Sequence, residues 1–161
     1  MKGPILLIRN IHKTAFGGAE TYQLTLAKEL QELDHQPIII SSSKPLQQAA
    51  KKQKIPIIKP AYLPAQNWSG YRNLFLPIYV LWQIILFCWY LIIICRLKPQ
   101  ALHIQSRDDM IAGTLAAHVT KTRVIWTDHS DFRLVIWENV DKKYKNPIGK
   151  FILKIAKYAD K

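Results

Sequence analysis

Residues 10–35, NIHKTAFGGAETYQLTLAKELQELDH, decide the fold, because they lead from a short apolar strand through a glycine pair into a helix. The strand is the apolar run Ile5 to Ile8, which has the size of a buried parallel strand. After Gly17 and Gly18, apolar residues recur at helical spacing and leave polar residues, Gln23 among them, on another face. Such a loop places a helix N-terminus at the carboxyl end of a strand, where anionic ligands commonly bind. We therefore expect a phosphate-facing cleft here, with a plain turn as the alternative role for the two glycines.

The rest of the chain alternates between strand-like and helix-like segments. Strands are predicted at 37–40, 55–58, 101–104 and 123–127, and helices at 44–53, from a Ser106 or Asp108 cap to about Thr120, and from Pro147 onward. This alternation predicts an α/β fold with a Rossmann-like, doubly wound parallel sheet. The glycine loop lacks a GxGxxG turn, and serines 41–43 stand where a dinucleotide-binding unit carries an acidic residue. The pattern therefore argues against an NAD or FAD enzyme.

Residues 74–95, LFLPIYVLWQIILFCWYLIIIC, form a long apolar segment of 22 residues without a charge. This length meets the criterion for a transmembrane helix. The strands predicted before and after the segment belong to one sheet, however, and a crossing would put the two halves of that sheet on opposite sides of the bilayer. We therefore favour a helix that is partly packed on the sheet and partly sunk in the membrane interface. A fully buried core helix and a true span are the two alternatives.

Particular side chains add expectations for this apolar region. Its aromatic residues suit the lipid headgroup boundary, namely Tyr71, Tyr79, Trp82, Trp89 and Tyr90. Pro77 is expected in the first helical turn, where proline does least harm. Cys88 and Cys95 lie seven residues apart on one helix, about 10 Å along its axis, and therefore cannot pair with each other. Two unpaired cysteines suit a reducing cytosol.

The charge distribution points to an anionic partner. The chain has 161 residues and a formal net charge of +12, from 23 Lys and Arg against 11 Asp and Glu. No Asp or Glu occurs between Asp34 and Asp108, whereas nine Lys or Arg do. Such a tract favours a membrane surface or nucleic acid. We do not expect nucleic acid, because most aromatic residues lie in the apolar segment and not between Lys and Arg.

The N-terminal sequence bears on the location of the protein. Ile5 to Ile8 is too short for the apolar core of a secretory signal and is followed by Arg9. We therefore expect a cytoplasmic protein, peripheral or monotopic at the inner face of the cell membrane.

Two stretches carry a family resemblance. Residues 17–42, GGAETYQLTLAKELQELDHQPIIISS, resemble the opening of the N-terminal domain of glycosyltransferase family 4, with Asp34-His35 in place of a Gly-His pair. Residues 97–132, LKPQALHIQSRDDMIAGTLAAHVTKTRVIWTDHSDF, resemble a strand-helix-strand unit of the same family, with Gln100 in place of Asp. The resemblance implies one half of a GT-B fold. Residues 1–161 would be a single Rossmann-like acceptor-side domain, with a hydrophobic helix inserted at 74–95 and the C-terminal donor-binding domain absent.

The resemblance also implies an activity. Enzymes of this family transfer a sugar from a nucleotide-sugar, mostly with retention of anomeric configuration and without a metal or other cofactor. We expect a hexosyltransferase whose acceptor is lipid-linked or another glycan, and whose partners are an anionic membrane surface and the missing C-terminal domain. The chain alone is then expected to be inactive. The competing hypothesis is a non-enzymatic, membrane-anchored Rossmann-like interaction module.

The same resemblance assigns candidate site residues. His129 lies in a loop like the family's histidine loop, where the imidazole contacts the donor sugar, and is the catalytic candidate; pairing with Asp128 or Asp131 for structural reasons is the alternative. Gly17 and Gly18 would let the backbone approach the donor phosphates. Ser106, Arg107 and Asp108 follow a predicted strand and are acceptor-side candidates, although Asp108 could merely cap a helix.

Overall fold

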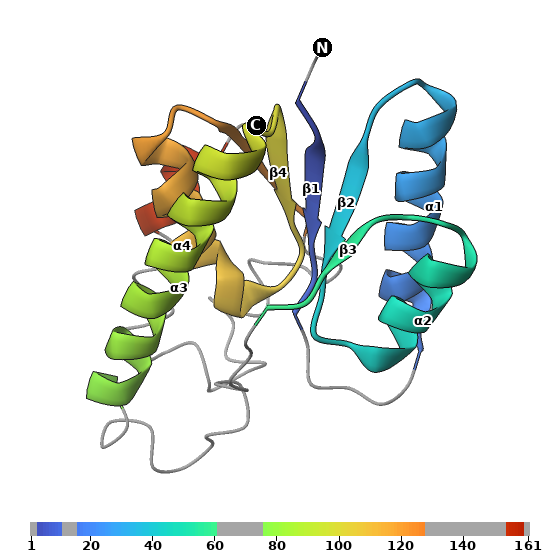
Figure 1. Ribbon diagram of the computed structural model, residues 1–161. Coiled ribbons are helices and arrows are strands. Elements are labelled where there is room, and N and C mark those ends of the chain that lie inside the picture. The colour runs from blue at the N-terminus through green and yellow to red at the C-terminus, as the bar shows by residue number, and fades with distance from the viewer. Residues whose placement is uncertain (1–2, 11–15, 61–75, 128–153, 160–161) are drawn as a thin grey trace.

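The computed structural model describes residues 3–10, 16–60, 76–127 and 154–159, and within them five parallel strands form one sheet (Figure 1). In chain order the elements are β1 (Ile5–Ile8), α1 (Gly18–Glu32), β2 (Pro37–Ile40), α2 (Lys44–Lys52), β3 (Ile57–Ile58), α3 (Leu76–Leu97), β4 (Ala101–Ile104), α4 (Arg107–Val119), β5 (Arg123–Trp126) and the 3-10 helix η3 (Ala156–Tyr158). The strand order is β3-β2-β1-β4-β5. The predicted doubly wound parallel sheet is therefore confirmed.

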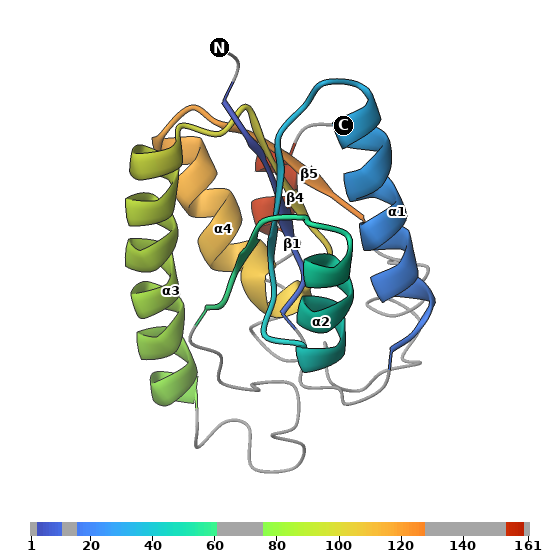
Figure 2. The same cartoon turned by 45° about the vertical axis from the view of Figure 1, so that its right-hand side comes forward.

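The helices cover the two faces of the sheet in pairs. α1 and α2 lie on one face, and α3 and α4 on the other (Figures 1 and 2). The central strand β1 supplies both cores, because successive side chains point to opposite faces. Leu6 and Ile8 belong to the core under α3 and α4, whereas Leu7 belongs to the core under α1 and α2. This is why β1 is apolar at every position.

Strand β3 is shorter than predicted, and the helix before it explains the difference. Ile55 was expected to open the strand, but its N–H donates to the carbonyl of Ala50 as part of the α2 terminus. Pro56 has no N–H to donate, although its carbonyl accepts from Ile39. Regular pairing therefore begins only at Ile57.

Helices in the described part of the chain end in left-handed residues that are not glycine. Four such residues have positive φ, each within two residues of a helix end: Asp34 (58°), Lys54 (57°), Lys98 (47°) and Lys121 (56°). After α1, α2 and α4 the hydrogen bonds follow the Schellman pattern, as in the bonds from His35 to Leu30 and from Thr122 to Ala117. Asp34 thus occupies a position that usually belongs to glycine, which explains how Asp34-His35 can replace a Gly-His pair.

Helix α3 packs along one stripe only. Its buried residues recur every three or four positions and face α4 and the sheet: Tyr79, Gln83, Leu86, Tyr90 and Ile94. Large apolar residues on the remaining surface are about half exposed, namely Ile78, Val80, Leu81, Ile84, Ile85 and Ile92. We call this second set the exposed α3 face. The alternative of a fully buried core helix is therefore wrong.

The predictions for two aromatic residues of α3 are wrong. Tyr79 and Tyr90 were expected at a headgroup boundary, but both are buried, and Tyr90 is completely inaccessible. Tyr71 lies outside the described residues. Pro77 does lie in the first turn, as predicted. Cys88 and Cys95 are both exposed and unpaired. The burial follows from the tyrosines' places on the inner stripe, which the all-round apolar sequence did not reveal.

The left-handed helix ends generate a stability prediction. Lys54→Gly should raise the free energy of unfolding by about 1 kcal/mol, because glycine adopts positive φ without the steric cost that lysine bears. Gln53→Gly is the matched control, since Gln53 has φ −91° and glycine there only enlarges the freedom of the unfolded chain. Urea unfolding of the two variants should therefore give shifts of opposite sign. Destabilisation by Lys54→Gly would contradict the left-handed assignment.

Candidate functional site

The glycine loop meets the end of β1 at the carboxyl edge of the sheet, through Glu20. One carboxylate oxygen of Glu20 accepts from Arg9 Nε at 2.8 Å, and the other accepts from the Gly17 N–H at 2.9 Å. Burial opposes the ionisation of Glu20, but the hydrogen bond and positive charge of Arg9 outweigh it and hold the pKa of Glu20 below its usual range. Glu20 therefore fixes the start of α1 against the strand that precedes the loop.

Because Glu20 bonds Gly17, the two glycines differ in how they could contact a ligand. The Gly17 N–H is bonded to Glu20 and is not free for a ligand. A Cβ atom at Gly18 would meet no atom of the described residues within 4 Å, so in this part of the chain the space beside Gly18 is open. Gly17 has an extended φ of −137°, which any residue can adopt. Among the described residues of the loop, Gly18 thus leaves the most room for a ligand to approach the backbone.

A buried carboxylate lies behind the same edge. Asp109, in the first turn of α4, is 1% exposed and accepts from Asn10 Nδ2 at 3.0 Å, from the Tyr90 hydroxyl at 2.7 Å and from the Ser106 hydroxyl. The Ser106 hydroxyl in turn accepts from the backbone N–H of Asn10 at 3.1 Å. Asn10 Oδ1 accepts from the Ser42 N–H. We call Asn10, Tyr90, Ser106 and Asp109 the Asp109 cluster; it ties the ends of β1 and β2 to α3 and α4.

Burial governs the protonation of this cluster. Desolvation raises the pKa of Asp109, although the hydrogen bonds from Ser106, Tyr90 and Asn10 oppose the shift. Desolvation, together with the negative charge of Asp109, raises the pKa of Tyr90 well above 10. Tyr90 therefore remains a hydrogen-bond donor at neutral pH. The cluster is buried from solvent. It holds strand and helix ends together and does not present a titratable group to a ligand.

The three acceptor-side candidates lie in different environments. Ser106 occupies the N-cap position of α4, as predicted, but its side chain makes no capping hydrogen bond. Its hydroxyl donates instead to the Asp109 carboxylate, as a buried member of the Asp109 cluster. Asp108 is also buried, inside the first turn, and its backbone carbonyl accepts from Gln83 Nε2 at 2.9 Å. Arg107, the first residue of α4, is half-buried. Of the three, Arg107 is the side chain most open to solvent.

His129 lies outside the described residues. The strand before it, β5, ends at Trp126, which pairs with Ile104 of β4. The chain therefore leaves β5 at the carboxyl edge, where β1 leads into the glycine loop. The role of His129 stays a prediction.

Two buried amides were missed by the sequence reasoning. Gln105 follows β4 at the carboxyl edge and is 6% exposed, and neither polar atom of its side chain has a partner within the part of the chain that the structure describes. The same holds for Gln23, which helical spacing had assigned to a polar face. A buried amide is costly unless it is hydrogen-bonded. The signal for Gln105 was its place at a strand end; the sequence offered none for Gln23 beyond its polarity.

The Arg9–Glu20 contact generates a pH prediction. Because the pKa of Glu20 is lower in the folded state, its contribution is fully present above its ordinary value of 4.5 and is lost as pH falls through the folded pKa. Glu20→Gln should lower the free energy of unfolding by about 1–3 kcal/mol at pH 7, and this difference from the unmodified chain should shrink below pH 4.5. Denaturant unfolding of both proteins at several pH values measures this difference in unfolding free energy.

A matched control is available on the same helix. Glu32 is exposed and lies 3.8 Å from Lys28 across one turn, so Glu32→Gln should have little effect at any pH. A Glu20→Gln difference that stays constant from pH 7 to pH 3 would rule out the proposed charge effect.

Comparisons with known proteins agree with this geometry. Residues 16–161 match the model of Glycosyltransferase Family 4. No curated protein matches the chain. Among solved structures, a glycosyltransferase from Rickettsia africae is 22% identical, with a TM-score of 0.64 over 95% of this chain and 35% of its own. HepE from Anabaena, solved with UDP-glucose, is 10% identical, with a TM-score of 0.58 over 96% of this chain and 35% of its own.

Another similar structure sets a limit on what the fold alone can show. A putative UDP-N-acetylglucosamine 2-epimerase from Listeria monocytogenes is 14% identical, with a TM-score of 0.62 over 99% of this chain and 38% of its own. The chain thus spans little more than a third of each of these structures. The fold is shared with an epimerase, so the family match must carry the assignment. The chain belongs to glycosyltransferase family 4, and its Rossmann-like sheet is that of the N-terminal domain of a GT-B glycosyltransferase.

Proposed function

We propose that this domain works at the membrane surface, as the acceptor side of an enzyme that transfers a hexose from a nucleotide-sugar to a lipid-linked acceptor. The observation that carries the proposal is the exposed α3 face in a domain of glycosyltransferase family 4. A nucleotide-sugar donor is supported by Anabaena HepE, which was solved with UDP-glucose. Transfer with retention and without a metal or other cofactor is part of the proposal, as is the need for a C-terminal GT-B domain.

The proposed chemistry takes place at the carboxyl edge of the sheet. Gly18, with open space beside it, would approach the donor phosphates, while Gly17 shapes the loop through Glu20. His129 would orient a sugar hydroxyl, since a neutral imidazole can donate one hydrogen bond and accept another. On the acceptor side we retain Arg107 for direct contact, with Ser106 and Asp108 shaping the start of α4. The amide of Gln105, which has no hydrogen-bond partner among the described residues, is an additional group that an acceptor hydroxyl could satisfy.

The membrane part of the proposal rests on the packing of α3. Among the described residues, one helix, Pro77–Leu97, is long and apolar enough to cross a bilayer, and a third of its apolar 18-residue window is buried in the protein. β1 pairs in parallel with both β2 and β4, so the segments on either side of α3 contribute to one sheet. We therefore place α3 in the interface without crossing, with the domain on the cytoplasmic face. Burial of several half-exposed apolar side chains contributes several kcal/mol at about 25 cal/mol per Å².

The role of His129 is tested kinetically. In a protein that combines this chain with a matching C-terminal domain, His129→Ala should lower kcat/KM by a factor on the order of 10², as expected for one oriented polar contact at the reacting sugar. The free energy of unfolding should change little. His35→Ala is the control, because His35 follows α1 at the opposite edge of the sheet. Loss of folding without a separate kinetic defect would assign His129 a structural role.

The same preparation tests the transferase assignment. Sugar transfer to extracted membrane lipids should require both domains, with no turnover by this chain alone. A combined protein that binds membranes but transfers no sugar from any nucleotide-sugar in a panel would favour the interaction module instead.

The membrane contact of α3 is tested by charged substitutions on its exposed face. Leu81 and Ile85, 58% and 49% exposed, lie one turn apart, whereas the neighbouring Leu86 is buried in the core and should be left intact. Leu81→Glu with Ile85→Glu should lower binding to vesicles on the order of 10²-fold, since two apolar contacts are replaced by charges. Leu33→Glu, at an exposed leucine after α1, is the control and should bind normally.

Topology is checked separately. On sealed vesicles, protease cleavage near Asn67 and cleavage after Lys98 should occur from the same side of the membrane. Access from opposite sides would overturn the non-spanning arrangement.

A further inference from the structure

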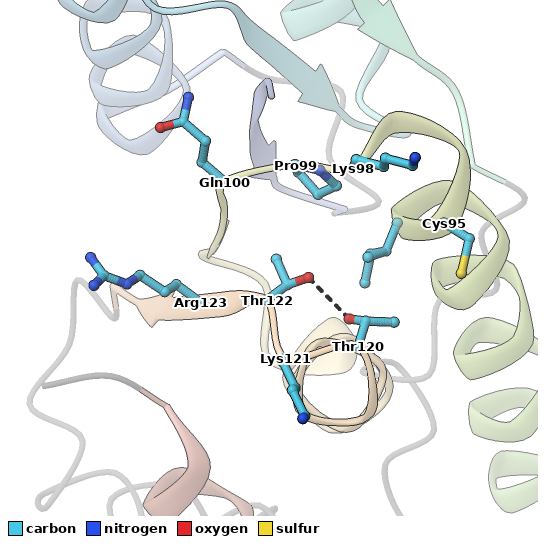
Figure 3. Close-up of a pocket in the computed structure, with 9 residues that line it drawn as sticks. Cys95, Lys98, Pro99, Gln100, Thr120, Lys121, Thr122 and Arg123 are labelled. Atoms are coloured by element: carbon cyan, nitrogen blue, oxygen red, sulfur yellow. Dashed lines mark hydrogen bonds between the residues drawn. The ribbon is translucent and has the colours of Figure 1, made fainter. Parts of the chain in front are cut away.

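A pocket lies at the amino edge of the sheet, opposite the candidate transfer site. Its volume is about 670 Å³, and it is bounded by the end of α3, the turn from α4 into β5 and the residues that lead into β4 (Figure 3). The four-residue strands separate it from the carboxyl edge by about 13 Å. The pocket is therefore distinct from the glycine loop and from Ser106, Arg107 and Asp108.

The border of this pocket is positively charged. Lys98, Lys121 and Arg123 line it, and none of the nine described lining residues is Asp or Glu. In Figure 3 the three cationic side chains extend outward in different directions, while the hydroxyls of Thr120 and Thr122 hydrogen-bond to each other at 3.0 Å. The arrangement is thus an uncharged hollow inside a positively charged rim. Such a rim suits a polar headgroup whose negative charge lies at the edge of the hollow.

The pocket is continuous with an apolar stripe of α3. Cys95 lines the pocket and is exposed. Ile85, Cys88 and Ile92 precede it at intervals of three or four residues, so they share one side of the helix, and all three are exposed. An apolar surface therefore leads directly to a cationic rim. This pairing fits an amphiphile, whose acyl chain would lie along the stripe while its charged head reaches the rim.

We propose that this pocket binds the phosphate headgroup of an anionic phospholipid and thereby fixes the C-terminal end of α3 at the membrane. The inference rests on the proposed membrane contact and adds to it a lipid class and a second contact point. A soluble phosphate is a poorer ligand, because the rim cations are exposed and their attraction for a small anion is screened by salt. A lipid already held by its acyl chain is presented to the rim at high local concentration.

The left-handed helix ends allow a rim charge to be removed without destabilising the fold. Lys121→Gly removes a rim charge at a left-handed position, where glycine should not destabilise the fold. Lys54→Gly makes the same charge change in the same backbone conformation at the end of α2, on the opposite face of the sheet. The two variants therefore differ only in the location of the lost charge.

Vesicle flotation is measured with neutral phosphatidylcholine vesicles and with vesicles in which about a third of the lipid is anionic phosphatidylglycerol. The unmodified chain should bind the anionic vesicles more tightly. Lys121→Gly should lower binding to them about fivefold, and the Lys98→Gly, Lys121→Gly double variant about 10- to 30-fold, with no change on neutral vesicles. Lys54→Gly should change binding less than twofold.

Each other outcome has a distinct meaning. Equal binding to both vesicle types would overturn the pocket proposal and leave the membrane contact of α3 intact. Absence of binding to any vesicle would overturn the membrane contact as well. Equal losses for Lys54→Gly and Lys121→Gly would show that the preference comes from overall net charge. Protection of Cys95 from a thiol reagent by inorganic phosphate alone, without vesicles, would assign the pocket to a soluble anion and overturn the lipid assignment.

Discussion

The parallel pairing of β1 with β4 constrains every residue between them in the chain. The chain leaves β1 at the carboxyl edge and must return to the amino edge to begin β4. α3 makes the last part of that return, packed beside α4 (Figure 1). A helix that packs on one side buries only one stripe, so an all-apolar helix in this position leaves apolar side chains exposed. The proposed membrane contact and the proposed lipid pocket both depend on this arrangement.

The Asp109 cluster holds that arrangement together at the carboxyl edge. A buried carboxylate is tolerated because three donors, Asn10, Tyr90 and Ser106, satisfy its oxygens. These donors come from the end of β1, the middle of α3 and the start of α4, so the cluster links the apolar helix to the loops of the candidate site. Glu20 has the corresponding role for the glycine loop, because it bonds both Arg9 and Gly17. The two carboxylates thus position the site without needing to contact a substrate.

Much of the fold was predictable because local patterns and tertiary packing agree. β4 was predicted at its observed bounds, and α4 within a residue or two, because Ser106 is a strong N-cap residue and the apolar runs are short. The start of β3 was less predictable, since no glycine marks the end of α2; Lys54 adopts the left-handed conformation there and carries Ile55 into the helix cap. At the site, the position of Ser106 at the start of α4 was predictable, but the Asp109 cluster was not, because Asn10 and Asp109 are about a hundred residues apart in the chain.

The sequence by itself determined the element order, the parallel sheet and the family, because hydrophobic periodicity, turn residues and the GGAE motif are local properties of the chain. Only the tertiary structure decided which side of α3 is buried. Residues 76–95 are apolar on all sides, so no periodicity distinguishes Tyr90, which is inaccessible, from Ile92, which is half exposed. The same holds for the rim of Lys98, Lys121 and Arg123, whose closeness depends on how α3, α4 and β5 pack at one edge. Contacts between distant elements set burial and charge clustering, and a single strand or helix does not encode them.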